Sequence, residues 1–198
     1  RKVTVKFLTQ MEMTMIPGIP AIQGIIIVID SITGEILSVM DGGNITALRT
    51  GAASGLATRL FAGKEANTMA LFGCGAQGKT QIEAVLCERP VRKILIFEKN
   101  RDRAYRFIEK LQGETSAEIV FCEDTSALNE ADIICTATNA TAPLFKREDV
   151  KKGVHINAIG SFQPHMQELD PRLIRDARVF LDSWEPCLKE SGDLIKPI

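Results

Sequence analysis

The chain has 198 residues, of which 45% are hydrophobic and 25% charged, so it can bury a real core and is not biased towards disorder. Lysine and arginine number 24 against 25 aspartates and glutamates, and the net charge of −1 leaves no basic field for a nucleic-acid backbone or an acidic lipid surface. No apolar run approaches the roughly 20 residues of a membrane-spanning helix. We therefore expect neither nucleic acid nor a membrane as a partner.

The cysteines are spaced widely and irregularly, with no C-x-x-C pair and no zinc-ligand pattern. We expect free thiols, no metal site and a cytoplasmic protein. The chain begins at Arg1 rather than at a methionine and ends at Ile198, which leaves open whether it is a trimmed piece of a longer protein. The five cysteines are Cys74, Cys87, Cys122, Cys135 and Cys187.

The first forty residues have the pattern of strands. Residues 3–8 alternate with a period of two, and after an interruption at 17–20 a β-branched run follows at 24–29. Residues 30–34 have turn chemistry, and 35–40 form the return strand of a hairpin. Three strands without a covering helix make an incomplete layer, so we expect a missing N-terminal segment or a partner subunit to cover them.

A helix is predicted over residues 44–62, with small side chains that let other backbones approach and Gly63 as its C-terminal stop. After it, short apolar segments alternate with helical ones, which is typical of a parallel sheet with helices on both faces. We predict strands at 68–72, 91–97, 118–122, 132–136, 154–159 and 178–181, and helices at 77–87, 101–111 and 125–131.

Residues 73–78 form a G-x-G-x-x-G motif directly after a predicted strand and at the start of a predicted helix. Gly73 permits a tight turn, Gly75 lets a pyrophosphate approach the backbone, and Gly78 allows the helix to pack closely on the strand. The N-terminus of the helix would face the phosphates. The predicted cofactor-binding residues in this loop are Gly73, Gly75, Ala76 and Gln77.

Glu98 stands 20 positions after Gly78, at the end of the next predicted strand. Its carboxylate would accept hydrogen bonds from the ribose hydroxyls of adenosine and repel a 2′-phosphate, which favours NAD. Lys99 and Arg101 follow, and either one would neutralise that phosphate and favour NADP. We predict NAD as the cofactor, with NADP as the alternative.

Several phrases of the sequence, in order and over nearly the whole chain, resemble the ornithine cyclodeaminase/mu-crystallin family. The resemblance implies a dimer with an antiparallel-sheet domain for substrate and dimerisation, and a Rossmann-type, doubly wound domain for a nicotinamide cofactor. We expect residues 1–48 to be part of the first domain and 49–198 to be the second, with the C-terminal return segment absent. The phrases are residues 39–42, 45–50, 73–77, 131–134, 136–138, 155–160, 182–183 and 189–193.

The resemblance also implies where the cofactor binds. Arg49 and Thr50 match positions that contact the cofactor phosphates, and a guanidinium is a good clamp for a pyrophosphate. The remaining residues lie where ligands bind in such sheets, at the carboxyl edges of two strands. The residues expected beside the nicotinamide ribose are Thr136, Ala137 and Thr138. The residues expected at the equivalent edge one strand later are Asn157, Gly160 and Ser161.

Lys2 matches a family lysine that sits over the reacting carbon and imine nitrogen of the substrate, where it would donate a proton or hold a carboxylate. Lys6 is the alternative if the register shifts. The cyclodeaminase branch carries an aspartate in the loop after Gly160, where this chain has Phe162, which cannot exchange a proton. This loop resembles the imine-reductase side of the family, and His165 nearby is a candidate to assist protonation.

We therefore expect an NAD(P)-dependent oxidoreductase of amino-acid metabolism that reduces a cyclic ketimine, such as Δ1-pyrroline-2-carboxylate, to the L-imino acid. The enzymatic alternatives are ornithine cyclodeaminase, which forms proline and ammonia, and alanine dehydrogenase. The non-enzymatic alternative is a crystallin-like protein that binds a small ligand with the cofactor. We expect a homodimer that takes a small amino-acid or imino-acid substrate.

Overall fold

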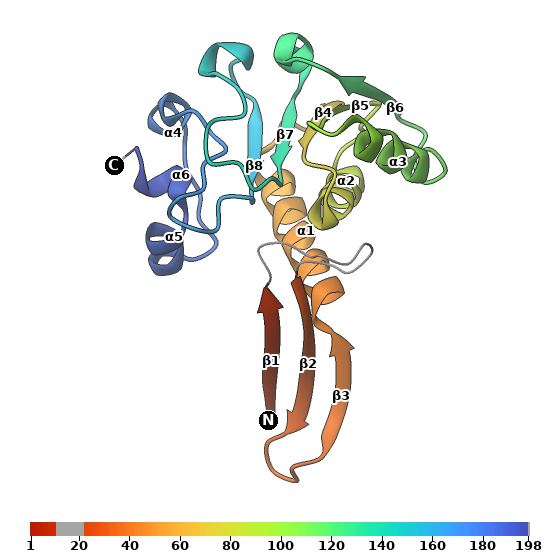
Figure 1. Ribbon diagram of the computed structural model, residues 1–198, viewed down its shortest axis with the longest axis vertical. Coiled ribbons are helices and arrows are strands. Elements are labelled where there is room, and N and C mark those ends of the chain that lie inside the picture. The colour runs from red at the N-terminus through yellow and green to blue at the C-terminus, as the bar shows by residue number, and fades with distance from the viewer. Residues whose placement is uncertain (11–21, 198) are drawn as a thin grey trace. The chain divides into compact units, whose positions relative to one another are not determined.

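The computed structural model describes residues 1–10 and 22–197, and Figure 1 shows the arrangement of the elements. The chain divides into two compact units, Arg1–Arg49 and Thr50–Ile198. The interruption predicted at residues 17–20 lies outside the described residues. Within the described residues no helix is long and apolar enough to cross a membrane.

The first unit holds an antiparallel sheet of three strands, β1 (Lys2–Gln10), β2 (Ile22–Asp30) and β3 (Ile36–Asp41), in the order β1-β2-β3. The predicted hairpin turn is present between β2 and β3. Asp30 Oδ1 accepts hydrogen bonds from the backbone N–H groups of Ile32 at 2.8 Å and Thr33 at 3.0 Å. Gly34 has φ +77°, a conformation that favours glycine, so the turn chemistry read from the sequence closes the hairpin.

One face of this sheet is apolar and open. Directly paired residues of antiparallel strands share a face, so the pairs Val3–Ile29, Val5–Ile27, Phe7–Ile25 and Ile27–Val39 line one side. Phe7 is 61% exposed and Val39 58% exposed. Among the described residues of this unit, Ile26 on the opposite face is the only buried hydrophobic side chain, so the sheet covers little of its own apolar surface.

Helix α1 (Gly42–Phe61) follows β3 and matches the helix predicted at 44–62. Gly63, the predicted stop, is not in the left-handed conformation of a glycine cap. Arg89 ends the helix instead: its guanidinium donates to the carbonyls of Thr58, at 2.7 Å, Arg59 and Ala62, and to that of Gly63. The carbonyls of Arg59 and Ala62 lie at the end of the helix, where no further turn supplies N–H donors, so a residue distant in sequence caps them.

The second unit is built on a five-stranded parallel sheet in the order β6-β5-β4-β7-β8. Its strands confirm five of the predicted segments and are short apolar runs, as expected for strands covered on both faces. The strands are β4 (Thr68–Phe72), β5 (Lys93–Phe97), β6 (Glu118–Cys122), β7 (Ile133–Thr136) and β8 (His155–Ala158).

Helices accompany both faces of this sheet, which confirms the Rossmann-type, doubly wound arrangement (Figure 1). Alternate strand residues enter two cores: Leu71 and Ile96 pack with Ile82 of α2, whereas Phe72 and Ile134 pack with neighbours from the other side. The helices are α2 (Ala76–Glu88), α3 (Arg101–Leu111), α4 (Pro171–Asp176), α5 (Trp184–Glu190) and α6 (Gly192–Ile195), with 3-10 turns η1 (Thr125–Glu130) and η2 (Arg147–Asp149).

The strand predicted at residues 178–181 is wrong. This segment is irregular, and Phe180 is 59% exposed and stacks its ring on that of Phe61, with 3.8 Å between the centroids. A strand added to a parallel sheet must be covered on both faces. The apolar side chains of this short run remain at the surface, so it offers no buried face for such a strand.

Candidate functional site

The strand order reverses between β4 and β7. From β4 the chain crosses through α2 to β5 on one side, whereas β7 and β8 lie on the other side of β4. At such a point, the loops after two neighbouring strands leave in opposite directions and open a crevice outside the carboxyl ends of these strands. Ligands of doubly wound sheets bind in this crevice. The predicted cofactor-binding residues from 73 to 161 follow or end the strands β4, β5, β7 and β8 at this edge.

The three glycines of the loop after β4 differ in what surrounds them. Gly73 has φ +98°, and a Cβ atom on it would lie 2.5 Å from the carbonyl oxygen of Ala137. A Cβ atom on Gly78 would lie 2.5 Å from the carbonyl oxygen of Gly73. A Cβ atom on Gly75 would meet no heavy atom within 4 Å, and its φ of −88° is open to any residue. The fold therefore requires glycine at 73 and 78, while the space at Gly75 is free for a ligand.

The N-terminus of α2 has no side-chain cap. Gly75 occupies the N-cap position and forms no side-chain hydrogen bond there, and the N–H of Gly78 donates to the carbonyl of Gly75 at 3.2 Å. The amide groups of Ala76 and Gln77 open the helix. Helix N-termini present N–H groups and a partial positive charge, so this end of α2 is suited to an anion such as a phosphate.

Glu98 lies against the glycine loop. Its Oε2 accepts a hydrogen bond from the N–H of Cys74 at 3.0 Å, and its Oε1 accepts one from the N–H of Asn100 at 3.0 Å. Burial first, and then the charge of Glu98, raise the pKa of Cys74 to about 12, so that thiol is neutral near pH 7. The acid predicted to bind ribose hydroxyls thus stands beside the loop predicted to bind the phosphates.

Three basic residues, Lys99, Arg101 and Arg103, follow Glu98 closely in the sequence. Lys99 is exposed, and Arg101 forms an ion pair with Glu123. The cation that faces Glu98 is Arg103, with 3.9 Å between Nη1 and Oε2. Arg103 lies in the first turn of α3. A charged residue at the start of a helix is usually exposed to solvent, so sequence reasoning did not select Arg103.

The segments that end β7 and β8 meet at a buried acid. Glu168 accepts hydrogen bonds from the hydroxyl of Thr136, from the N–H and the hydroxyl of Thr138, and from the N–H of Gly160. Ala137 is held on the other side, where its N–H donates to the carbonyl of Phe72 at 2.9 Å. Burial raises the pKa of Glu168, against the effect of the hydrogen bonds from Thr138, Thr136 and Gly160. Sequence reasoning missed Glu168, because an acid in a polar loop gives no signal of burial.

Two other predicted residues turn their side chains inward. The amide nitrogen of Asn157 donates to the hydroxyl of Thr58 at 3.0 Å, and both side chains are buried. The hydroxyl of Ser161 accepts the N–H of Asp193 at 3.0 Å. Both side chains therefore stabilise the protein itself, so any contact of these positions with a ligand would be through the main chain.

The remaining candidates near the second sheet occupy surface or structural positions. Phe162 and His165 are exposed, and the carbonyl of His165 accepts a hydrogen bond from Lys196 Nζ at 2.8 Å. His155 is half-buried, and its Nε2 lies 3.1 Å from Asn157 Oδ1. Burial lowers the pKa of His155, so the ring is held neutral.

The other predicted residues belong to α1 and the first unit. Lys2 is exposed and lies opposite Asp30 in the register of β1 and β2, whereas Lys6 donates from Nζ to Thr46 Oγ1 at 2.9 Å. Arg49 is exposed on α1, at the end of the first unit, and Thr50 begins the second. The roles predicted for Lys2, Arg49 and Thr50 stay predictions.

No group of three or more His, Cys, Asp or Glu side chains among residues 1–10 and 22–197 is placed to hold a metal ion. All five cysteines are free thiols.

Known proteins resemble this chain in sequence and in structure. It is 41% identical over 183 residues to a Δ1-pyrroline-2-carboxylate reductase of Bacillus cereus, an overlap of 91% of this chain and 56% of that protein. The Thermococcus litoralis Δ1-pyrroline-2-carboxylate reductase, solved in complex with NADH and L-proline, matches with a TM-score of 0.87 and 37% identity, over 91% of this chain and 56% of that one.

An archaeal alanine dehydrogenase dimer with bound NAD matches with a TM-score of 0.90 and 27% identity, over 98% of this chain and 60% of that one. The chain thus spans somewhat more than half the length of these proteins. The model of the ornithine cyclodeaminase/mu-crystallin family matches residues 1–196. This chain therefore belongs to the ornithine cyclodeaminase/mu-crystallin family.

Proposed function

We propose that this chain is part of an NAD(P)-dependent reductase of cyclic ketimines, with Δ1-pyrroline-2-carboxylate as the type of substrate. The observation that carries the proposal is the free space at Gly75, between a strand end and an uncapped helix N-terminus. A dinucleotide needs such a place for its pyrophosphate. The similarity to two Δ1-pyrroline-2-carboxylate reductases supports the substrate class.

The cofactor, when bound, supplies a hydride from C4 of its reduced nicotinamide. The imine carbon accepts this hydride, the imine nitrogen takes a proton, and an L-amino acid with a secondary amine results. We assign the proton, or the grip on the substrate carboxylate, to Lys2. Arg49 and Thr50 would bind the cofactor phosphates, with the loop at 73–77.

The two ends of the cofactor, adenosine and nicotinamide, are assigned to different residues. Glu98 would bind the adenosine ribose, and we prefer NAD because its carboxylate repels a 2′-phosphate. Arg103 beside it keeps NADP as the alternative. At the nicotinamide end we assign residues 136–138, with Asn157, Gly160 and Ser161 acting through the main chain.

The assembly and location are part of the same proposal. We propose a homodimer, since one face of the first sheet is apolar and open and the alanine dehydrogenase of similar structure is a dimer. Residues 1–48 would be part of the substrate and dimerisation domain, and residues 49–198 the cofactor domain. The free thiols of all five cysteines support a reducing compartment, the cytoplasm.

The reaction is tested with the full-length protein, NADH or NADPH, and Δ1-pyrroline-2-carboxylate, followed by the absorbance of the reduced cofactor. We expect oxidation of the cofactor without release of ammonia. Pyruvate with ammonia tests the second candidate, alanine dehydrogenase, which the archaeal structure favours. Ornithine tests cyclodeaminase: ammonia with no net change in cofactor would contradict the proposal and show that Phe162 does not exclude that reaction.

Gly75→Ala tests the site itself. We expect an unchanged Tm, because the added methyl group meets no atom of the protein, and an affinity for NADH reduced by about tenfold or more, because it blocks the approach of the pyrophosphate. Gly63→Ala is the matched control: a Cβ atom there also meets nothing within 4 Å, but Gly63 precedes β4 at the opposite edge of the sheet. Equal NADH affinity of the two variants would contradict the assignment.

A further inference from the structure

A single buried carboxylate joins the ends of two neighbouring strands. Glu168 Oε1 accepts the N–H and the hydroxyl of Thr138, both at 2.7 Å. Its Oε2 accepts the hydroxyl of Thr136 at 2.7 Å and the N–H of Gly160 at 2.8 Å. Each oxygen thus receives two donors, which is the capacity of an ionised carboxylate. Thr136 ends β7, and Gly160 follows β8 by two residues.

This carboxylate is held without a counter-ion. Glu168 is 0% exposed, and it forms no ion pair with a lysine, arginine or histidine in the described part of the chain. A buried charge is unfavourable unless hydrogen bonds compensate it, so the four donors must stay in place around it.

Glu168 has close neighbours on two sides. A Cβ atom on Gly160 would lie 2.5 Å from the Glu168 carboxyl group, so only glycine lets the two segments approach this closely. From the other side, Asp193 Oδ1 accepts the N–H groups of Glu168 at 2.8 Å and Leu169 at 2.9 Å. Backbone hydrogen bonds already pair the strand ends, where the N–H of Ile159 donates to the carbonyl of Thr136 at 3.0 Å. Beyond this last pair, the Glu168 carboxylate holds the segments at Thr138 and Gly160 together.

The ends of β7 and β8 line the half of the crevice opposite the proposed adenosine site. The glycine loop and Glu98 follow β4 and β5, so a dinucleotide that lies across the switch point extends its other half towards β7 and β8. The nicotinamide, which carries the reacting C4 atom, would rest on the segments that Glu168 joins.

We infer that Glu168 is a positioning residue, which aligns the nicotinamide with the substrate by holding Thr136 and Thr138 against Gly160. The inference rests on the proposed reductase function. A misplacement of about 1 Å in a reacting group lowers a rate by roughly 100-fold. Glu168 should therefore affect hydride transfer more strongly than cofactor affinity, which the glycine loop and Glu98 supply from the other half.

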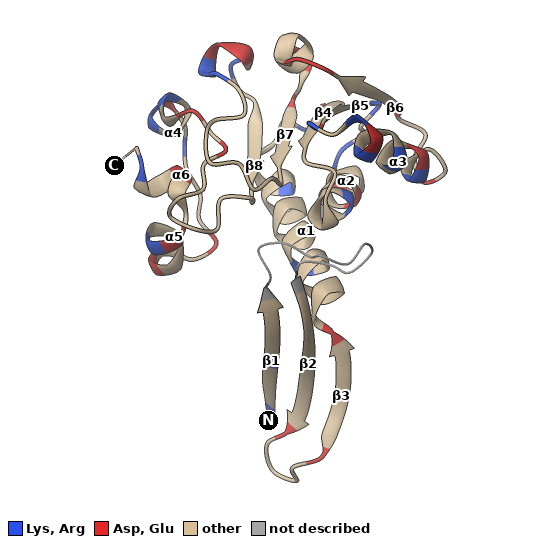
Figure 2. Cartoon of the chain, viewed as in Figure 1, with Lys and Arg blue, Asp and Glu red and all other residues tan. Residues whose placement is uncertain are grey.

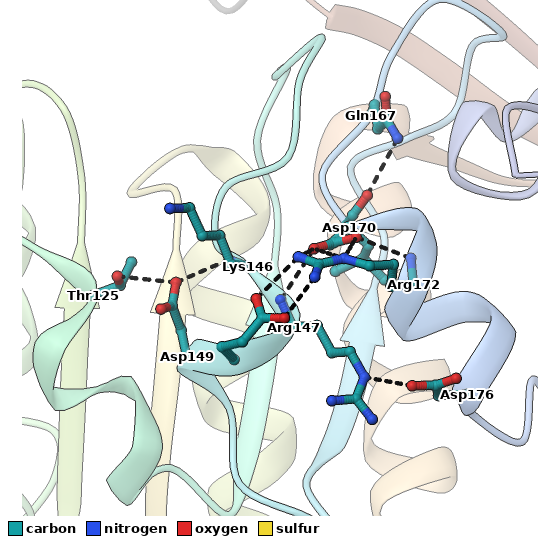
Figure 3. A network of polar contacts seen from close by, with 10 residues as sticks. Thr125, Lys146, Arg147, Asp149, Gln167, Asp170, Arg172 and Asp176 are labelled. Atoms are coloured by element: carbon teal, nitrogen blue, oxygen red, sulfur yellow. Dashed lines mark hydrogen bonds and ion pairs between the residues drawn. The ribbon is translucent and has the colours of Figure 1, made fainter.

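Asp170 offers a matched control only two residues away. Figure 3 shows its carboxylate paired with the Arg172 guanidinium, and it also accepts the N–H of Arg147 at 3.1 Å. Arg172 in turn pairs with Glu148. This network joins η2 to α4 and includes none of the predicted cofactor-binding residues, so Asp170 stabilises the same unit without positioning the cofactor.

The test compares Glu168→Gln with Asp170→Asn in the full-length protein. A glutamine offers one accepting oxygen and one donating nitrogen, so in either orientation its NH₂ group meets a backbone N–H, that of Thr138 or of Gly160. We expect kcat to fall by about 10- to 100-fold and the KM for NADH to change by less than about threefold. With NADH deuterated at C4, we expect a larger isotope effect on kcat, since hydride transfer becomes the slow step.

Asp170→Asn should lower Tm and leave kcat within about twofold of the wild-type value. If Glu168→Gln also lowers only Tm, with kcat and the isotope effect unchanged, the inference is overturned. If that variant does not fold, Thr136→Val decides: it removes one donor from the carboxylate at nearly constant volume, and we expect a smaller loss of kcat, whereas an unchanged kcat overturns the inference. An inactive wild-type protein would instead refute the proposed function.

Discussion

The two sheets of this chain bury their apolar side chains to very different degrees. In the five-stranded sheet, Met69, Leu71, Ile94 and Ile134 are completely buried, and each belongs to a core shared with helices or loops. In the three-stranded sheet, one face stays open, and Figure 2 shows few charged residues along β1, β2 and β3 compared with α3. The second unit thus has a core of its own, whereas the apolar face of the first is suited to contact another surface.

The largest expected effect tests the core of the second unit. Ile134→Ala removes a fully buried side chain that packs with Phe72, Leu128 and Phe145, and we expect the free energy of unfolding to fall by about 2 to 5 kcal/mol. Urea denaturation followed by circular dichroism measures it. Ile32→Ala is the matched control, because Ile32 is 83% exposed in the β2–β3 turn and should change stability by less than about 0.5 kcal/mol. Similar losses in both variants would contradict this difference.

A smaller effect concerns the response to pH of two acids in the second unit. Hydrogen bonds from Arg172 hold the pKa of Asp170 well below its usual 3.8, so its stabilising contribution is present above pH 3.8 and is lost as the pH falls through the lowered value. The pH dependence of Glu168 has the opposite sign, because burial raises its pKa. Its contribution to stability is fully present below the usual pKa of 4.5 and is lost as the pH rises through the raised pKa.

We therefore expect the Tm difference between the wild type and Asp170→Asn to be constant at neutral pH and to shrink below pH 3.8. Differential scanning calorimetry over a pH series measures this. A difference that grew on acidification would show that the pKa of Asp170 is not lowered in the folded state.

The smallest effect on stability is expected at the open face of the first sheet. Val39→Ser should change the free energy of unfolding of the dissociated chain by less than about 0.5 kcal/mol, since Val39 is already exposed. In the full-length protein it should weaken the proposed dimer, which sedimentation over a range of concentrations measures. Val179→Ser, an exposed valine of the second unit, is the control and should leave association unchanged. Unaltered association in both variants would argue against a dimer through this face.

Local patterns predicted the elements whose residues act through near neighbours. The strands β4 and β5 are short apolar runs between polar turns, and G-x-G-x-x-G follows β4 directly, so these segments and the glycine loop could be predicted from spacing alone. The β2–β3 turn is similar, because Asp30 bonds the amides two and three residues later.

The residues that sequence reasoning missed act across the fold. Glu168 bonds donors at Thr136 and Thr138, 32 and 30 positions earlier in the chain, and Arg89 caps a helix that ends 28 positions before it. Contacts between such distant positions leave no periodic pattern in the sequence. From the sequence alone, Glu168 and Arg89 are therefore expected at the surface, like most charged residues. The strand expected at residues 178–181 failed for the same reason, because whether an apolar run is buried depends on what the rest of the chain places over it.

The bond between Thr58 and Asn157 spans 99 positions of the sequence. A nascent chain presents α1, β4, α2 and β5 well before β8 is made, and contacts between distant segments form only after the entropy of closing a long loop has been overcome. The edge of the sheet around the glycine loop can thus take shape early in folding, whereas the β7–β8 edge and the acid that joins it wait for the last third of the chain. In the order of folding, the part of the crevice that we propose for the reacting end of the cofactor is completed last.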